Sequence, residues 1–378
     1  MASPQIFGRS PYNSRRFLRA PESDPHGPLA GVETGILPPG LSLTSNGAGR
    51  TAAPEKPVYL LLDEIQQVDQ WEKALASFQV DFPCDIVITG SNAYLLSSEL
   101  ATLIAGRYVE IHLLPLSYEE LLNAWRTDDH PNRSTDQQEV FDHYLRYGGF
   151  PGLLELDGPP MLMRQYLESI YHTVVVKDIL ARTKVSNADL LERILRYLVM
   201  HTGSLISANK VADYLTSNGE KTFASKVTEY LRAFENAYIV YKAERYDLRG
   251  KRSLRSPNKY YLADTGLRRL FFNAIGEDTG RMLENLVFLE LKRRGYQVMT
   301  GIDHPGEIDF VAIRGQDRHY YQVSLSITDE NVRARELDVL RRLKDNHPKT
   351  LLTLDYRPEE NIDGIRIQRV TDYLLHFH

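Results

Sequence analysis

The feature that most constrains this fold is an apolar run, residues 59–62 (YLLL), that ends in two adjacent acids, Asp63 and Glu64. A short apolar run bounded by polar residues is typical of a strand buried in a parallel sheet. A second such run occupies residues 85–90 (DIVITG), and a third strand, expected over residues 107–114, leads into a helix. Strands that alternate with helices imply a parallel sheet, and such sheets bind ligands at the carboxyl ends of their strands. We therefore expect an α/β fold with both acids at its ligand-binding edge.

Two acids at the end of such a strand match the Walker B strand of P-loop ATPases. There, the first acid holds Mg²⁺ through water and the second orients the attacking water. We accordingly predict catalytic roles for Asp63 and Glu64, with Asp63 also contacting the cofactors ATP and Mg²⁺. Ser91 and Asn92, after the second strand, are candidate sensors of the γ-phosphate, and Arg107 is a candidate phosphate ligand. The competing interpretation is that the acids are only solvated ends of strands.

The Walker B interpretation requires an upstream phosphate loop, G-x-x-x-x-G-K-[ST], whose backbone and Lys cradle the phosphates. The sequence does not contain this motif. The nearest approach, residues 47–51 (GAGRT), has Arg in place of Lys. It also lies too close to the predicted Walker B strand for the helix and strand that normally follow a phosphate loop. We therefore expect ATP hydrolysis to be impaired.

Composition narrows the class of protein. The 378 residues suffice for two or three domains, and a formal net charge of −5 excludes a globally basic nucleic-acid coat. A single cysteine, Cys84, excludes an intrachain disulfide framework and a Cys-rich zinc site. No apolar run approaches the roughly 20 residues that cross a bilayer. A cytoplasmic protein with no membrane partner is the expectation.

The organisation along the chain predicts five segments. Residues 1–56 are rich in Pro, Gly and Ser and are expected to be disordered or atypical. The others are a truncated ATPase core at 57–123, a helical lid or linker at 124–186 with a long helix over 161–182, a winged helix at 187–264, and an α/β domain at 265–378.

The winged-helix prediction rests on two amphipathic helices, near residues 208–215 and 223–237, followed by strands at 238–243 and 258–263 around a polar loop. We call residues 242–259 the basic hairpin, because its cations outnumber its acids. These cations are Lys242, Arg245, Arg249, Lys251, Arg252, Arg255 and Lys259. A cation-rich hairpin beside a helix–turn–helix predicts duplex DNA as a partner, with Lys226, Arg249, Lys251, Arg252 and Arg255 as contacts. The alternatives are a protein-binding module and a merely solvated surface.

Four polar residues in the last segment, Glu284, Glu307, Asp309 and Gln322, resemble the site of the restriction-endonuclease fold. There, carboxylates hold Mg²⁺ and a Lys helps to activate water. We expect Glu284, Glu307 and Asp309 to be metal ligands, as Asp63 is in the first site. The position of the Lys is taken by Ser324, so a nuclease-like fold with weak or no cleavage is predicted. An active nuclease and a purely structural role remain as alternatives.

Several motifs in series make residues 57–378 similar to the bacterial and archaeal AAA-type P-loop ATPases with a C-terminal domain of unknown function. They include YLLLDEIQQVDQWEKAL, DIVITGSN, YLRYGGFPG, KYYLADTGLRR, GRMLENLVFLELKRRGYQV and EIDFVA. The resemblance implies ATP binding, a Mg²⁺ and water role for Asp63 and Glu64, a sensor role for Ser91 or Asn92, and a phosphate role for Arg107. It also implies a winged helix and a degenerate nuclease-like end.

Two functions follow. The first is an ATP-binding member of that family, impaired in hydrolysis because the phosphate loop is absent. The alternative is a non-enzymatic DNA-binding or regulatory protein that acts through the winged helix and the nuclease-like domain. A protein partner or a homo-oligomer is also expected, since many AAA-type ATPases complete their sites between subunits.

Overall fold

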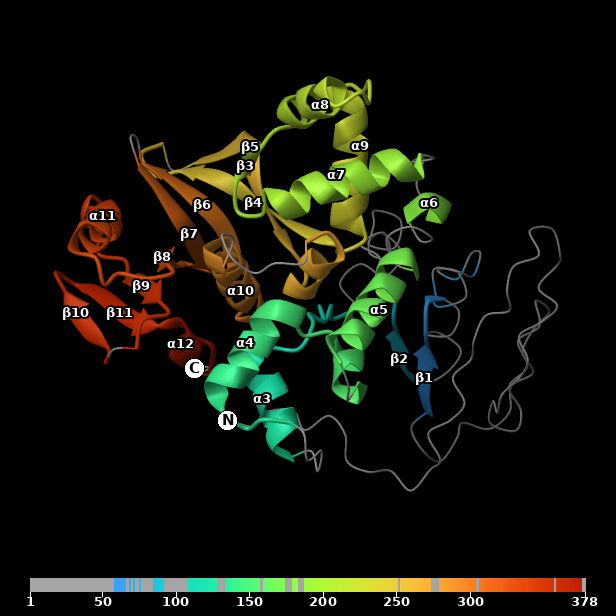
Figure 1. Ribbon diagram of the computed structural model, residues 1–378, viewed down its shortest axis with the longest axis horizontal. Helices are drawn as coiled ribbons and strands as arrows, with labels where there is room; N and C mark the ends of the chain where they lie inside the picture. Colours follow the sequence, from blue (N-terminus) through green and yellow to red (C-terminus); the bar gives the residue numbers. More distant parts are fainter. Residues whose placement is uncertain are drawn as a thin grey trace. The chain divides into compact units, whose positions relative to one another are not determined.

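The computed structural model describes residues 58–65, 68, 71, 75, 84–91, 108–127, 133–156, 159–173, 179–182, 187–250, 252–272, 279–303, 306–356 and 358–375. The chain divides into two compact units, residues 1–110 and 111–378, which we call the first and the second unit. Helices and strands occur together, which confirms the predicted α/β class (Figure 1). The predicted disordered segment, residues 1–56, lies outside the described residues.

The first unit contains the two predicted strands, β1 (Val58–Leu62) and β2 (Cys84–Ile88), which are parallel with Leu62 opposite Ile88. Ile65, Trp71 and Leu75 are buried and pack on one face of this pair. Tyr59 and Leu61 are 66% and 57% exposed, so the prediction of a strand buried on both faces is wrong for the described residues. Successive side chains of a strand point to opposite faces, and the described core covers one of them.

The predicted third strand is also wrong. Residues 108–117 are irregular, and Val109, Ile111 and Leu113 are 88%, 73% and 86% exposed. Their alternation with polar residues imitates a strand, but no strand pairs with them among the described residues. Leu116 instead donates its backbone N–H to the carbonyl of Gly149 at 2.8 Å.

Helices predominate in the first part of the second unit. They are α3 (Tyr118–Thr127), α4 (Gln137–Tyr147), the 3₁₀ helix η3 (Pro151–Glu155), α5 (Pro160–Ile170), α6 (Ile179–Arg182) and α7 (Ala188–Met200). The single long helix predicted over 161–182 is not formed as one element, since α5 ends at Ile170 and a π-helical turn follows at 171–173. The β-branched residues 174–176 of that prediction lie outside the described residues.

Two further helices, α8 (Ala208–Ser217) and α9 (Ala224–Asn236), meet at a turn where Gly219 has a positive φ of 87°. The Ser207 side chain accepts from the backbone N–H of Lys210 and so begins α8. The buried faces of α7, α8 and α9 form one core that contains Leu191, Ile194, Val211, Val227, Tyr230 and Phe234. The predicted pair of amphipathic helices is therefore present.

The hairpin that follows is longer than predicted. Its strands are β4 (Val240–Asp247) and β5 (Arg252–Leu262), so most of the expected polar loop is strand. Arg245 pairs with Leu254 and Asp247 with Arg252 across the hairpin, while the same part of β4 also pairs in parallel with β6. These pairings extend the strands because they satisfy backbone groups on both sides of β4.

Within the described residues, nine strands form one sheet in the order β10-β11-β9-β8-β7-β6-β4-β5-β3. The remaining members are β3 (Leu205–Ile206), β6 (Gln297–Asp303), β7 (Gly306–Arg314), β8 (Asp317–Ser324), β9 (Lys349–Thr353), β10 (Glu360–Ile362) and β11 (Ile365–Arg369). The sheet is mixed, since β7 and β8 pair antiparallel whereas β8 and β9 pair in parallel. The hairpin β4–β5 belongs to the same sheet, because β4 pairs with β6. One sheet therefore spans the predicted boundary between the segments 187–264 and 265–378.

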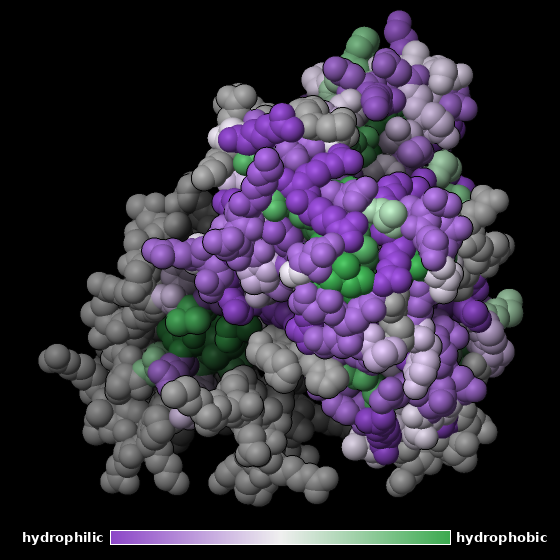
Figure 2. Space-filling model, turned by 90° about the vertical axis from the view of Figure 1, so that its left-hand side faces the viewer, coloured by the Kyte–Doolittle hydropathy of each residue, from purple (hydrophilic) through white to green (hydrophobic). Residues whose placement is uncertain are grey.

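Helices cover both faces of this sheet. On one face, α10 (Thr279–Arg293) and α12 (Val370–Leu375) pack with α3 and α4 around Phe288, Tyr261 and Phe310. On the other face, α11 (Glu330–Arg341) packs through Leu337 and Leu340. The side that bears α11 and β10 is mainly hydrophilic, with hydrophobic residues gathered only in small areas (Figures 1 and 2). The short 3₁₀ helix η5 (Thr265–Leu270) links β5 to this core.

Candidate functional site

The carboxyl ends of β1 and β2 bring together the acids and hydroxyls that the sequence singles out. Thr89 donates its backbone N–H to the carbonyl of Leu62 at 2.9 Å, which holds the two strand ends side by side. The Thr89 hydroxyl donates to Oδ1 of Asp63, and the Ser91 hydroxyl donates to Oε2 of Glu64 at 3.0 Å. Each acid is thus matched to one hydroxyl from the neighbouring strand.

The backbone at Glu64 makes this arrangement possible. Its φ of 49° lies in the left-handed region, which a non-glycine residue seldom adopts. The Glu64 N–H donates to the Thr89 hydroxyl oxygen at 3.2 Å and holds this turn in place. Strained residues of this kind cluster at functional sites. The turn directs the carboxylate of Glu64 to Ser91 while the carboxylate of Asp63 stays exposed.

Mg²⁺ and ATP, which the resemblance implies, fit this site in part. Carboxylate and hydroxyl oxygens at the end of a parallel strand are the donors that Mg²⁺ prefers. The phosphates of ATP need a cradle of backbone N–H groups and a Lys, and none of the described residues near Asp63 supplies a Lys. Asn92 and Arg107, the other predicted members of the site, lie outside the described residues. Thr89, which directly follows β2, contacts both acids.

A second cluster of acids lies in the second unit around a buried lysine from β5. The ammonium of Lys259 lies 3.0 Å from Glu284, 2.8 Å from Glu307 and 3.7 Å from Asp309. The hydroxyl of Tyr261 donates to Oε1 of Glu284 at 2.6 Å. The Lys259 side chain is 4% exposed and that of Glu307 is 35% exposed, so the cluster opens to solvent at Glu307. One cation therefore serves three carboxylates.

The charged groups of this cluster shift one another's pKa values. Burial alone would lower the pKa of Lys259, but Glu284, Asp309 and Glu307 raise it above its ordinary value. Burial, and then the charge of Glu284, raise the pKa of Asp309. The backbone N–H of Val323 donates to Asp309 at 2.9 Å and opposes that rise. Lys259 is thus held in its charged form.

The structure brings Glu284, Glu307 and Asp309, the proposed metal ligands, together around the ammonium of Lys259. The sequence places Lys259 among the cations of the basic hairpin, whereas in the structure it lies in β5 with its side chain buried. Gln322 accepts from the backbone N–H of Asp309 and donates to Glu336, so it supports β7 and α11. Among the described residues, no group of three or more His, Cys, Asp or Glu is placed to hold a metal ion. Metal binding by Asp63 and by this cluster stays a prediction.

Two of the residues predicted to contact DNA have described side chains, and both are paired with acids. Lys226 lies 3.0 Å from Glu229, and Arg249 lies 2.8 Å from Asp303. Lys242 lies 3.2 Å from Glu244. Lys251 and the side chains of Arg252 and Arg255 lie outside what the structure describes, although the backbones of Arg252 and Arg255 belong to β5.

Comparison with known proteins identifies the family. A model of the AAA domain matches residues 42–122, and a model of a domain of unknown function, DUF8612, matches residues 138–278. An uncharacterised protein of Haemophilus influenzae is 40% identical over 321 residues, which is 85% of this chain and 78% of that protein. An uncharacterised protein of Methanocaldococcus jannaschii is 29% identical over 298 residues, which is 76% of this chain and 65% of that protein.

Among solved structures, a Walker-type ATPase of Pyrococcus abyssi matches with a TM-score of 0.38 at 16% identity, over 56% of this chain and 62% of that one. Within the described residues, no helix is both long and apolar enough to cross a membrane. The AAA match includes Asp63, Glu64 and the end of β2, and the bacterial relative is similar along most of its own length. The chain therefore belongs to the AAA-type P-loop ATPase family, and its AAA domain is followed by a domain of unknown function.

Proposed function

We propose that this chain is an ATP-binding member of the family in which the Mg²⁺- and water-orienting half of the ATPase site is retained and hydrolysis is impaired. The supporting observation is the double contact across the strand ends, Asp63 with Thr89 and Glu64 with Ser91. Asp63 would hold Mg²⁺ through water, and the metal would supply positive charge to the phosphates. Glu64, held by Ser91, would orient the attacking water.

Impaired hydrolysis follows from the missing phosphate cradle. The 378 residues contain no G-x-x-x-x-G-K-[ST] sequence, and transfer of the γ-phosphate depends on positioning and charge stabilisation by such groups. Asn92 and Arg107 are proposed as additional contacts to the phosphates. The same incompleteness favours a second copy of the chain or another protein as a source of phosphate ligands.

Calorimetric titration of the full chain with ATP and Mg²⁺ tests this proposal, together with a measurement of phosphate release. We expect Mg²⁺-dependent binding that Asp63→Asn weakens by about tenfold or more, equal to about 1.4 kcal/mol. Turnover should stay well below about 1 s⁻¹, the lower end for ordinary enzymes. Asp85→Asn, at an exposed position of β2, is the matched control and should bind like the parent chain.

Two results would contradict the proposal. Binding that is equal in the parent chain and in Asp63→Asn would remove the Walker B role. Turnover on the order of 1 s⁻¹ or faster would mean that a complete phosphate site exists. Glu64→Gln should keep ATP binding and lose any residual turnover, since its role is assigned to the attacking water.

The alternative function, DNA binding or regulation through a winged helix and a nuclease-like domain, has the helix pair α8–α9 and the hairpin β4–β5 in its favour. We rank this function second because the described cations predicted to contact DNA are paired with acids, as Arg249 is with Asp303. The cleavage hypothesis is weaker still, because the ammonium of Lys259 lies between the carboxylates that would hold the metal ion.

A further inference from the structure

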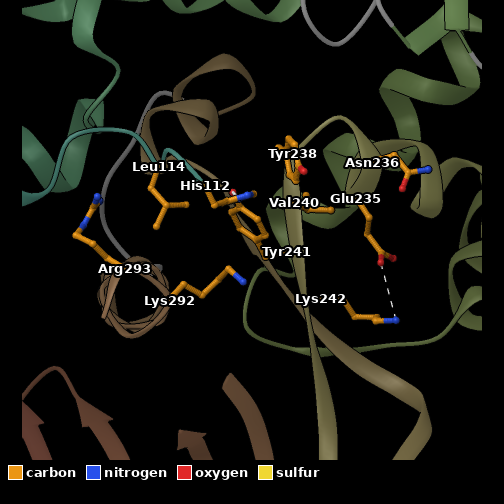
Figure 3. A pocket seen from close by; sticks show the side chains of 10 residues that line it. All are labelled: His112, Leu114, Glu235, Asn236, Tyr238, Val240, Tyr241, Lys242, Lys292 and Arg293. Carbon is orange, nitrogen blue, oxygen red and sulfur yellow. Dashed lines mark hydrogen bonds and ion pairs between the residues drawn. The ribbon is translucent and has the colours of Figure 1, made fainter. Parts of the chain in front are cut away.

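A pocket of about 490 Å³ lies in the second unit, and none of its lining residues belongs to the two clusters of acids described above (Figure 3). Three segments line it: residues 112–114, residues 235–242 from the end of α9 into β4, and the last residues of α10. Its volume falls within the range of pockets that hold small organic ligands. The pocket is therefore large enough for a ligand of more than a few atoms.

One wall of the pocket is aromatic. The His112 and Tyr238 rings meet edge to face with centroids 4.7 Å apart, and the His112 and Tyr241 centroids are 6.0 Å apart. Nε2 of His112 and the hydroxyl of Tyr241 are hydrogen-bonded at 3.1 Å. Flat π surfaces of this kind are suited to contact with a planar ring of a ligand. We call these three side chains the aromatic wall.

The backbone is strained where it presents this wall. Tyr238 has a φ of 53°, a conformation that is an outlier for a bulky residue. Its N–H donates to the carbonyl of Glu235 at 3.1 Å, so the turn after α9 is held in this form. Strain of this kind persists where the surroundings determine it, and ligand clamps are among the places where it is found.

A single cation in the pocket has no acid beside it. The ammonium of Lys292 lies 4.9 Å from the centroid of the Tyr241 ring, on the pocket side of α10 (Figure 3). Among the described residues it has no hydrogen bond or ion pair, and burial is what lowers its pKa. An ammonium that is partly withdrawn from water and lacks a counter-ion favours an anion as its ligand.

The other charged residues of the lining are already matched. Lys242 lies 3.9 Å from Glu235, the ion pair drawn in Figure 3. Arg293 points away from the pocket, where it donates to the carbonyl of Pro115 at 2.7 Å and lies 3.5 Å from Glu290. Among the described charged residues of the lining, the ammonium of Lys292 is thus the positive group available to bind a ligand.

From this combination we propose that the pocket binds a nucleoside monophosphate, with its phosphate on Lys292 and its base against the aromatic wall. A Lys binds phosphate as a point charge, and an aromatic side chain stacks on any base. One ammonium matches one phosphate better than it matches a triphosphate. This site is separate from the ATP site proposed at Asp63, and it does not depend on that proposal.

The test is a calorimetric titration of the full chain with AMP, with adenosine and with inorganic phosphate, all in EDTA so that the Asp63 site has no Mg²⁺. We expect AMP to bind with a dissociation constant on the order of 1 mM or tighter, and more tightly than either fragment. Lys292→Met should weaken AMP binding by about tenfold or more, and Lys292→Arg should retain it. Lys344→Met, at an exposed position, is the matched control.

Several outcomes would overturn the proposal. One is the absence of AMP binding to the parent chain, and another is equal binding to the parent chain and to Lys292→Met. Equal affinity for phosphate and AMP would remove the role of the aromatic wall. Loss of AMP binding in Asp63→Asn would move the ligand to the first unit. Failure of the Mg²⁺–ATP titration alone would leave this site unaffected, so the two proposals fail separately.

Discussion

At the scale of single residues, the buried carboxylate of Asp264 joins two turns of the second unit. It accepts from the backbone N–H of Gly149 at 2.7 Å and from that of Gly266 at 2.8 Å. Gly148 has a φ of 80°, and a Cβ there would lie 1.6 Å from Oδ1 of Asp264. Two of the sequence motifs, YGGFPG and LADTG, are therefore parts of one contact. Burial raises the pKa of Asp264 to about 7, against the two N–H donors.

That raised pKa predicts a pH dependence of stability. The folded chain holds a proton on Asp264 up to about pH 7, whereas in the unfolded chain the group loses it near its ordinary value of 3.8. The stability that this proton contributes is present below pH 3.8 and is lost as the pH rises through about 7. Asp264→Asn cannot titrate and leaves one backbone N–H facing an amide donor, at a cost of about 1–3 kcal/mol.

The measurement is urea unfolding of the parent chain and of Asp264→Asn between pH 5 and 8. We expect the difference between them to be larger at pH 5 than at pH 8, because only the parent chain loses the Asp264 contribution in that interval. Asp317→Asn, at an exposed acid, should follow the parent chain at every pH. A difference that grows toward pH 8 would contradict the assignment.

At the scale of elements, Lys259 is the point where β5, α10 and β7 meet. Its partners come from α10 (Glu284) and β7 (Glu307 and Asp309). Ion pairs in a buried setting recover their desolvation cost only when all groups are matched. Removal of the one cation would leave three acids that repel each other in a site of low exposure. The cluster therefore holds the hairpin to the rest of the sheet.

Lys259→Met tests this role. The variant should lose about 3–5 kcal/mol of stability at neutral pH, the range for breaking a buried ion pair. The loss should shrink as the pH falls, since protonation of the carboxylates removes their repulsion. Urea unfolding at pH 5 and 8 measures both effects, with Lys344→Met as a control at an exposed position. Equal stability of Lys259→Met and Lys344→Met at pH 8 would refute the stabilising role of Lys259.

The elements also show why some features follow from sequence and others do not. β1, β2, α7 and α8–α9 were predictable because apolar period and caps such as Asn187 and Ser207 are local signals. The closeness of Asp63 to the end of β2 was predictable because two parallel strands place their carboxyl ends together. The buried position of Lys259 was not predictable, since the direction of its side chain depends on how β5 pairs in the sheet and not on the adjacent residues in the sequence. The apolar alternation of residues 109–113 predicted a strand for which no partner is described.

At the scale of the whole molecule, the distribution of charge bears on the choice between the two functions. The formal net charge is −5. Two exposed arginines of the second unit are matched to acids, Arg341 to Asp363 at 2.7 Å and Arg366 to Glu359 at 2.7 Å. In the basic hairpin, Lys242 and Arg249 are likewise paired, with Glu244 and Asp303. Alternating charges of this kind favour solubility over a single-sign field.

A duplex-DNA titration over a range of salt concentrations measures how many cations of the chain are free to bind DNA phosphates. Affinity falls as salt rises, and each phosphate neutralised by a free cation adds about 0.9 to the magnitude of this negative slope of log affinity against log salt. Because Lys242 and Arg249 of the hairpin are paired with acids, we expect a slope smaller in magnitude than about 3 and a dissociation constant on the order of 10⁻⁴ M or weaker at physiological salt. Arg249→Ala with Lys251→Ala should then change little. A slope of magnitude about 6 or more in the parent chain, and a smaller magnitude in this double variant, would instead support the DNA-binding function. The cations of the hairpin would then exchange their acid partners for phosphates.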